Sequence, residues 1–136
     1  LVLSGQPTSD VTVTINPNAQ LSVAAASVTF TPVNWATPQT VTVSAVNDAV
    51  AEGTHSGTIA HTVTSTDPVF DGLSVGNVIA TITDNDVAGV VITENSGTPN
   101  NNDITVTENG AGSSVAVVLT SQPLSDVQIS LTFNPT

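Results

Sequence analysis

Two short acidic segments carry the residue types in this sequence that are best suited to binding an ion. Asp48 and Glu52 lie in "VNDAVAEG", and Asp84, Asn85 and Asp86 form "DND" at the end of "VIATITDND". Calcium takes about six to eight oxygen ligands, mixing carboxylates with amide and backbone carbonyls. Carboxylates that converge repel one another unless a cation neutralises them. If the strand ends bring the two segments to one pole of the fold, they predict a calcium site there.

A purely structural interpretation of the same segments stays open. Asp and Asn side chains form hydrogen bonds with nearby backbone groups and therefore favour turns. Under this interpretation Asp48 and the Asp84 to Asp86 triplet shape solvated turns and bind no ion.

Three further groups of residues are weaker candidates for a site. His55 and His61 share strand parity and could form a two-histidine metal site, although a rim histidine and a hydrogen-bonded sheet histidine are the simpler interpretation. Trp35, between two prolines, could stack on a sugar but is more typical of a residue that seals the edge of a core. Asp67 and Asp71 flank "PVF" and are expected to shape a turn rather than bind a second ion.

Nothing in the sequence indicates catalysis. There is no Cys, Lys or Tyr to act as nucleophile or base, and no serine lies in a nucleophile-elbow motif. A glycine-rich phosphate loop is also missing. We therefore expect that the protein is not an enzyme, since an enzymatic role would need an acidic pair in a cleft.

The net charge limits the kinds of partner that this chain could attract. It contains 11 Asp and Glu residues and no Lys or Arg, giving a formal net charge of -11. Such a chain repels nucleic acid and anionic membrane surfaces and attracts cations. No apolar run approaches the roughly 20 residues of a membrane helix, so membrane insertion is not expected.

The pattern of apolar residues is that of β-strands. In "DVTVTIN", Val11, Val13 and Ile15 alternate with polar residues, as in a strand with one buried face. "SVTFTP", "QTVTVSAV", "GTIAHTVTS", "DITVT", "SSVAVVLTS" and "DVQISLTF" alternate similarly, and segments rich in Gly, Pro, Asn and Asp separate them. Strands at this spacing predict an all-β, immunoglobulin-like antiparallel sandwich.

An internal repeat indicates a tandem organisation. "LSGQPTSDVTVTI", starting at Leu3, matches "LTSQPLSDVQISL", starting at Leu119, an offset of 116 residues. The chain therefore resembles a window on a tandem array, whose units contact mainly their neighbours. We expect residues 1–86 to form a sandwich lacking its first strand, and residues 87–136 to form a linker and the first strands of the next repeat.

Taken together, these segments resemble a known family. "VTFTPVNWATPQTVTVSAVNDAVAEGTH", followed by "VIATITDND" and "VTENGAGSSVAVVLTSQPLSDVQISL", is similar to the Calx-beta-like repeats of large bacterial surface and secreted proteins. The resemblance implies a sandwich that is often arrayed in tandem and holds calcium at one end. It also implies a glutamate ligand near the end of the first strand, which Glu108 in "VTENG" matches. No acid lies between Asp10 and Asp48, where the family commonly has a further carboxylate.

The resemblance and the composition lead to one expected function. The chain would be a structural repeat of an extracellular or cell-surface stalk, adhesin or fibre, with calcium stiffening the ends of the repeats. Its partners would be calcium and neighbouring repeats or copies of the same chain, whose residues 104–119 would complete a sheet by strand pairing. The alternative is a module that binds glycans or another protein at the cell surface.

Overall fold

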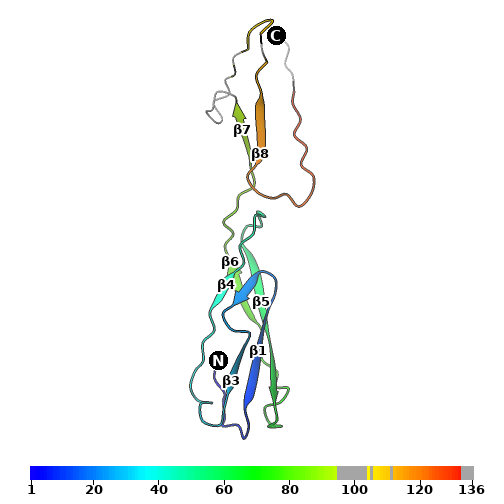
Figure 1. Cartoon of the computed structure of the whole chain (residues 1–136). Helices are drawn as coiled ribbons and strands as arrows, with labels where there is room; N and C mark the ends of the chain where they lie inside the picture. Colours follow the sequence, from blue (N-terminus) through cyan, green and yellow to red (C-terminus); the bar gives the residue numbers. More distant parts are fainter. Residues whose placement is uncertain (95–103, 105, 111, 133–136) are drawn as a thin grey trace. The chain divides into compact units, whose positions relative to one another are not determined.

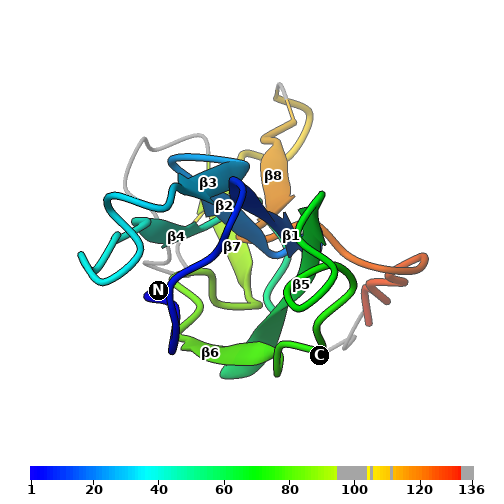
Figure 2. The same ribbon diagram turned by 90° about the horizontal axis from the view of Figure 1, so that it is seen from below.

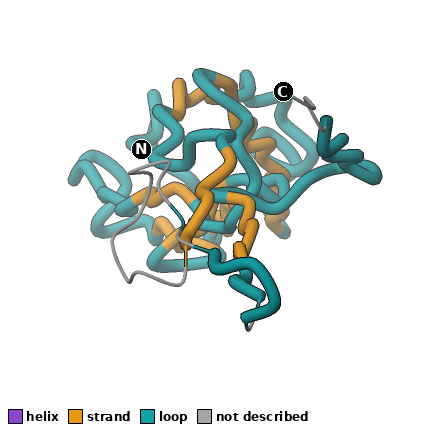
Figure 3. The backbone as a smooth tube through the Cα atoms, turned by 90° about the horizontal axis from the view of Figure 1, so that it is seen from above, coloured by secondary structure: helices purple, strands orange, loops and turns teal. Residues whose placement is uncertain are grey.

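The computed structural model describes residues 1–94, 104, 106–110 and 112–132. Every regular element within these residues is a β-strand, and their sheets are antiparallel. The backbone trace in Figure 3 accordingly contains strands and loops only. The all-β prediction is confirmed. The described residues contain no helix of the length and apolarity needed to cross a membrane.

The chain divides into two compact units. The first comprises Leu1–Asn47 and Thr54–Thr83, and the second comprises Asp48–Gly53 and Asp84–Thr136. The acidic segment around Asp48 therefore belongs to the second unit, together with the residues from Asp84 onward. The assignment of residues 1–86 and 87–136 to successive repeats stays a prediction.

A four-stranded sheet forms most of the first unit. Its strands are β1 (Val11–Pro17), β3 (Ser27–Phe30), β5 (His55–Ser65) and β6 (Val78–Ile82). They are arranged in the order β3-β1-β5-β6, and every pair is antiparallel. Val13 lies opposite Val28 on one side and Val63 on the other, so three valines share one face. Figure 2 shows the sheet curving from β3 through β1 and β5 to β6.

A smaller sheet completes the first unit. It contains β2 (Leu21–Val23) and β4 (Val43–Ala45), which pair antiparallel. Leu21 is buried against the core, and Val23 and Val41 are packed against it less completely. Four strands on one side thus face only two on the other, so the second layer is the narrower one.

The burial pattern explains why these segments are strands. Along β1, buried and half-buried residues alternate in step with the apolar and polar residues of "VTVTI". Ten apolar residues from both sheets and one loop form the core: Val11, Val13, Ile15, Leu21, Val28, Phe30, Ile59, Val63, Phe70 and Ile82. Phe30 and Val11 are fully buried. The first unit is therefore a sandwich-like arrangement around one aliphatic core.

The second unit is built on a two-stranded ladder of β7 (Val90–Glu94) and β8 (Val115–Leu119). Residues 48–53 join it through an isolated parallel bridge between Val50 and Gln122, whose amide donates to the Ala49 carbonyl at 2.7 Å. Figure 1 shows the two strands of this ladder side by side.

One strand expected from the sequence does not form in the second unit. Residues 127–132, from "DVQISLTF", are not in a strand, although the matching segment of the first unit is β1. Among the residues that the structure describes, no strand pairs with this segment, whereas β1 is held between β3 and β5. Of the expected "DITVT" strand, residues 103 and 105 lie outside the described residues, and Ile104, Val106 and Thr107 are not in a strand.

Candidate functional site

The first acidic segment forms a tight turn. The Val50 amide donates to Asp48 Oδ1 at 2.8 Å, which is the local side-chain to backbone bond that favours Asp in turns. The turn ends at Gly53, whose φ of 68° lies in the left-handed region that glycine adopts without steric cost. This local chemistry presents Asp48 and Glu52 at the surface.

Asp84 connects the two acidic segments. The amides of Glu52 and Gly53 donate to Asp84 Oδ2 at 2.6 and 2.9 Å, and the Asp86 amide donates to Asp84 Oδ1 at 3.0 Å. Both carboxylate oxygens of Asp84 thus accept backbone hydrogen bonds. The sequence prediction that the segments converge is confirmed for these residues, and their contact runs through backbone amides.

The remaining predicted ligands are distributed over the second unit. Asn85 is exposed and Asp86 is half-buried beside Asp84. Glu108 lies in a turn between β7 and β8 with Asn109, whose φ is 58°. This turn follows the end of β7, whereas Asp86 precedes its start, so the ladder separates Glu108 from the other candidates.

The predicted calcium ligands are not arranged around a common point. In the part of the chain that the structure describes, no three His, Asp or Glu side chains converge in an arrangement that could hold a metal ion. The oxygens of Asp84 are oriented toward amides rather than toward a shared point. Calcium binding here would need the carboxylates of Asp48, Glu52 and Asp86 to turn toward Asp84, and it stays a prediction.

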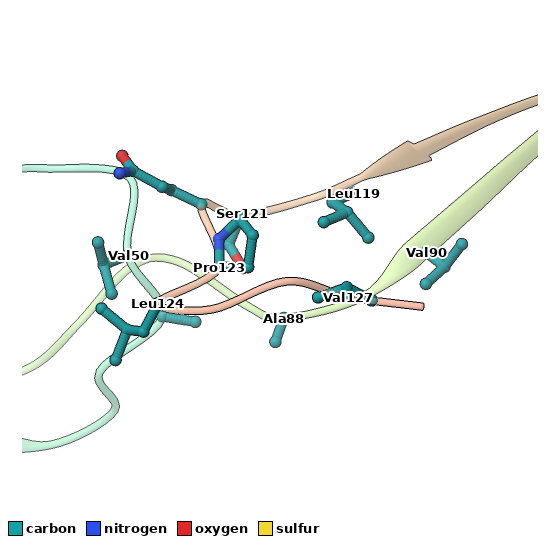
Figure 4. A pocket seen from close by; sticks show the side chains of 11 residues that line it. Val50, Ala88, Val90, Leu119, Ser121, Pro123, Leu124 and Val127 are labelled. Atoms are coloured by element: carbon teal, nitrogen blue, oxygen red, sulfur yellow. The ribbon is translucent and has the colours of Figure 1, made fainter. Parts of the chain in front are cut away.

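An apolar pocket lies next to the acidic turn in the second unit. It has a volume of about 460 Å³ and is lined mainly by aliphatic side chains, among them Val50, Ala88, Val90, Leu119, Pro123, Leu124 and Val127. Figure 4 shows these side chains around the pocket. Sequence analysis missed this pocket, although Val50 and Ala51 inside an acidic turn were a signal of local apolar packing.

A second apolar depression lies in the first unit, and we call it the edge groove. It has a volume of about 310 Å³ and is lined by Leu1, Ile15, Gln39, Thr40, Val41, Val43, Ile59, His61 and Val78. Its walls are thus one face of β1, β5 and β6 and the segment that enters β4. The groove lies where the two-stranded layer leaves the four-stranded sheet uncovered.

The two histidines do not form a shared site. They are six residues apart on β5, a separation of about 20 Å along a strand at roughly 3.3 Å per residue. His55 Nε2 lies 3.3 Å from Gln20 Oε1, and His61 Nδ1 donates to the Gly76 carbonyl at 3.2 Å. Their separate partners agree with the simpler interpretation of a rim histidine and a sheet histidine.

Asp67 and Asp71 shape the turn after β5, as the sequence predicts. Asp67 Oδ1 accepts a hydrogen bond from the Val69 amide at 2.9 Å, and Asp71 Oδ1 accepts one from the Ser65 amide at 3.1 Å. Asp67 is also buried and bonds Thr8, a partner 59 residues away that local sequence patterns do not reveal. Hydrogen bonds from Thr8 and Val69 hold the pKa of Asp67 below its ordinary value of 3.8.

Trp35 lies in a loop whose backbone forms hydrogen bonds within the loop and with the segment before β1. It is half-buried, its amide donates to the Thr31 carbonyl at 3.1 Å, and its own carbonyl accepts from the Leu3 amide at 3.2 Å. It lines neither the edge groove nor the pocket of the second unit. Both bonds involve the backbone, and Trp35 is not one of the residues packed against the core, so its role in sealing the edge of a core stays a prediction.

One buried acid was not singled out by the sequence. Glu94, at the end of β7, is buried, and its Oε2 has no hydrogen-bond partner among the described residues. The available signal was strand parity, because Glu94 lies on the same face of "VVITE" as Val90 and Ile92.

Comparisons with protein-family models, with curated proteins and with solved structures found no match to this chain.

Proposed function

We propose that this chain is a structural repeat of an extracellular stalk, adhesin or fibre, built from immunoglobulin-like sandwiches of the Calx-beta-like type. One observation carries the proposal. The motif that starts at Leu3 recurs at Leu119, and its two copies fall in separate compact units, which supports a chain built from repeated modules. In arrays of this kind each unit contacts mainly its neighbours, which suits an extended structural element.

The chemistry of the surface supports a mechanical role more than a binding one. The two apolar depressions have aliphatic linings that contain no Phe or Trp, whereas a glycan platform would need an exposed aromatic side chain. The absence of Lys and Arg gives the whole chain one sign of charge, which keeps neighbouring units apart until cations screen or bridge them.

Calcium is part of the proposal. Asp48, Glu52, Asp84 and Asp86 belong to one compact unit, and Asp84 already joins the two segments that contain them. An ion held by these carboxylates and by the Asn85 carbonyl would stiffen the connection that follows β6. Glu108, placed beyond β7, would belong to a separate site of the next repeat.

The structural role is tested by locating the protein on its source cells. Antibodies raised against the full chain should label filaments or stalks on intact cells without permeabilisation. Labelling that requires permeabilisation, or that shows no association with a surface structure, would contradict the proposed function.

The calcium site is tested by thermal melts of the full chain in calcium and in chelator. Calcium at about 100 times its dissociation constant should stabilise the folded chain by about 2.7 kcal/mol, since the ion binds the folded state only. Asp84→Asn should abolish this gain. Asp126→Asn removes an acid of the second unit outside the two segments and is the matched control, which should keep the gain. Equal melting temperatures in calcium and chelator would contradict an ion bound by the folded chain.

A further inference from the structure

The inference starts from Asp67, a buried acid that precedes a proline in the turn after β5. Its side chain is 4% exposed, and the turn lies beyond the arrowhead of β5 in Figure 1. The bond from Asp67 to Pro68 is the one Asp-Pro bond of the sequence. A bond to proline is a tertiary amide whose nitrogen carries no hydrogen. Such a bond breaks more readily than other peptide bonds when its nitrogen receives a proton and its carbonyl carbon is attacked.

Two backbone amides polarise the main-chain carbonyl of Asp67. The amides of Phe70 and Asp71 both donate to this carbonyl oxygen at 3.0 Å. When a nucleophile attacks the carbonyl carbon, negative charge develops on the same oxygen. Amides at this distance stabilise that charge, as the donors of an oxyanion hole do. The turn therefore favours attack on the peptide bond that joins Asp67 to Pro68.

The side-chain carboxyl group of Asp67 is the nearest nucleophile to this bond. Its attack on the main-chain carbonyl carbon of the same residue closes a five-membered ring and needs no second reactant. In the folded chain, however, Oδ2 accepts hydrogen bonds from the Thr8 amide and hydroxyl, and Oδ1 accepts one from the Val69 amide. These bonds restrain the carboxylate and favour its charged form, which has no proton to give to the proline nitrogen. They therefore protect the bond near neutral pH.

Two other titratable groups lie on the segments around Asp67. Asp10 precedes β1, and its carbonyl accepts a hydrogen bond from the Ser65 hydroxyl at 2.8 Å. Asp71 belongs to the same turn as Asp67, and its Oδ1 accepts a hydrogen bond from the Ser65 amide at 3.1 Å. The chain contains no Lys or Arg. Hydrogen bonds, rather than an ion pair with Lys or Arg, therefore hold the charge of Asp67.

We propose that the bond from Asp67 to Pro68 is a self-cleavage site, which the hydrogen bonds from Thr8 hold inactive and which protonation of the Asp67 carboxyl group activates. The carboxyl oxygen bonds to the main-chain carbonyl carbon, the carbon-nitrogen bond to Pro68 breaks, and the carboxyl proton passes to the proline nitrogen. The intermediate is a cyclic anhydride at residue 67, which one water molecule opens to two carboxyl groups. The net reaction is the hydrolysis of one peptide bond.

Cleavage would divide the chain within its first unit. β5 ends at Ser65 and β6 begins at Val78, so the two strands would belong to different fragments. Their antiparallel pairing extends from His55 opposite Ile82 to Ile59 opposite Val78 and includes no residue of the turn. The fragments would therefore stay together until the unit unfolds. In an array, a cleaved unit would be a point at which the chain parts on unfolding, but the reaction itself does not depend on the proposed structural role.

The test compares the full chain with Thr8→Val, which keeps the shape of the side chain and removes its hydroxyl. Both are incubated at a series of pH values from 7 to 2, and circular dichroism identifies the samples that stay folded. Mass spectrometry under denaturing conditions measures fragments 1–67 and 68–136. In mildly acidic buffer Thr8→Val should be cleaved about tenfold faster than the parent chain, because loss of one hydrogen bond to the charged carboxylate makes its protonated form about ten times more abundant.

The pH profile of cleavage separates this role of Thr8 from a general loss of stability. Loss of the Thr8 hydroxyl raises the pKa of Asp67 toward its ordinary value, so the profile of the variant should move to higher pH. Asp67→Asn removes the reacting carboxyl group and Pro68→Ala removes the tertiary amide, so neither variant should yield the fragments at the parent rate. Asp10→Asn changes an acid outside the reacting groups and is the matched control, which should be cleaved at the parent rate.

A comparison with unfolded chain shows whether the fold promotes the reaction. Urea at the same pH removes the Phe70 and Asp71 amides from the carbonyl, so the unfolded parent chain should be cleaved more slowly than folded Thr8→Val. Equal or faster cleavage in urea would overturn the proposal, since the bond would then break by its local chemistry alone. An unchanged rate in Thr8→Val, or chains that stay intact in every folded sample, would overturn it as well.

Discussion

Asp67 Oδ2 accepts hydrogen bonds from both the amide and the hydroxyl of Thr8, at 2.7 and 2.8 Å. The two residues are 59 positions apart, and the bond ties the segment before β1 to the turn after β5. Asp67 Oδ1 accepts a third bond, from the Val69 amide. One buried carboxylate thus fixes both a local turn and a long-range contact of the first unit.

This arrangement predicts acid sensitivity. The pKa of Asp67 is lowered from 3.8 because its hydrogen bonds with Thr8 and Val69 favour the carboxylate. Its contribution to stability is therefore fully present above about pH 4 and is lost as the pH falls through the lower, folded-state pKa. Urea unfolding followed from pH 7 to pH 2 should show the free energy of unfolding falling in this acidic range.

Asp67→Asn isolates the contribution of this one carboxylate. The variant should be less stable than the parent chain at pH 7, and the difference should shrink as the pH falls below 4. Asp10→Asn, at an exposed acid for which no side-chain bond is found in the described residues, is the control. A stability difference between the Asp67 variant and the parent that is independent of pH would contradict the assignment.

A second prediction concerns the close approach of Gly57 and Leu21. A Cβ at Gly57 would overlap the Leu21 side chain, which fills the space above β5. Gly57→Ala should therefore destabilise the chain by about 1–3 kcal/mol through overpacking. Gly76→Ala is the matched control, because no atom lies within 4 Å of its added Cβ. Thermal or urea unfolding of the two variants distinguishes the outcomes, and equal stability would show that Leu21 moves aside freely.

The fold class and the strand faces could be predicted from the sequence because both follow from a local period. The alternation in "VTVTI" gives Val11, Val13 and Ile15 as buried residues, and the structure buries all three. The contact between Gly57 and Leu21 depends on which strands become neighbours. The sequence within a few residues of either position does not show this. The same limit explains why the turn at Asp67 was predicted and its bond with Thr8 was not.

The candidate site, like the fold, could be predicted only in part from the sequence. Acidic residues at strand ends indicated that the segments of Glu52 and Asp84 converge, and the structure brings them together. The sequence could not reveal that backbone amides occupy the Asp84 oxygens, because amide directions depend on the turn geometry at Gly53. It also gave no signal for the edge groove, which arises from the unequal widths of two sheets.

A third prediction follows from the Asp84 tether. Asp84→Ala removes the acceptor of the Glu52 and Gly53 amides, so both amides should exchange with solvent hydrogen faster than in the parent chain. The Val50 amide donates to Asp48 instead and should be less affected. Hydrogen exchange followed by NMR in calcium-free buffer measures each amide separately. Unchanged exchange at Glu52 and Gly53 would mean that the tether contributes nothing to the order of this turn.

The last prediction uses the repeat as its own control. Ile15 and Leu131 occupy the same position of the repeated motif, yet Ile15 is 5% exposed and Leu131 is 90% exposed. Ile15 lies in β1 between β3 and β5, whereas residue 131 is not in a strand. Because strand partners rather than the motif decide burial, the two positions should respond differently to truncation.

Ile15→Ala should lower the free energy of unfolding by about 2–5 kcal/mol, since it removes buried methylene and methyl groups and leaves a cavity. Leu131→Ala should change it by no more than about 0.5 kcal/mol, as expected for an exposed residue without special contacts. Urea unfolding of dilute samples measures both, under conditions in which copies do not associate. A large loss at Leu131 would show that residues 127–132 are already packed in the isolated chain, contrary to the exposure of this side chain.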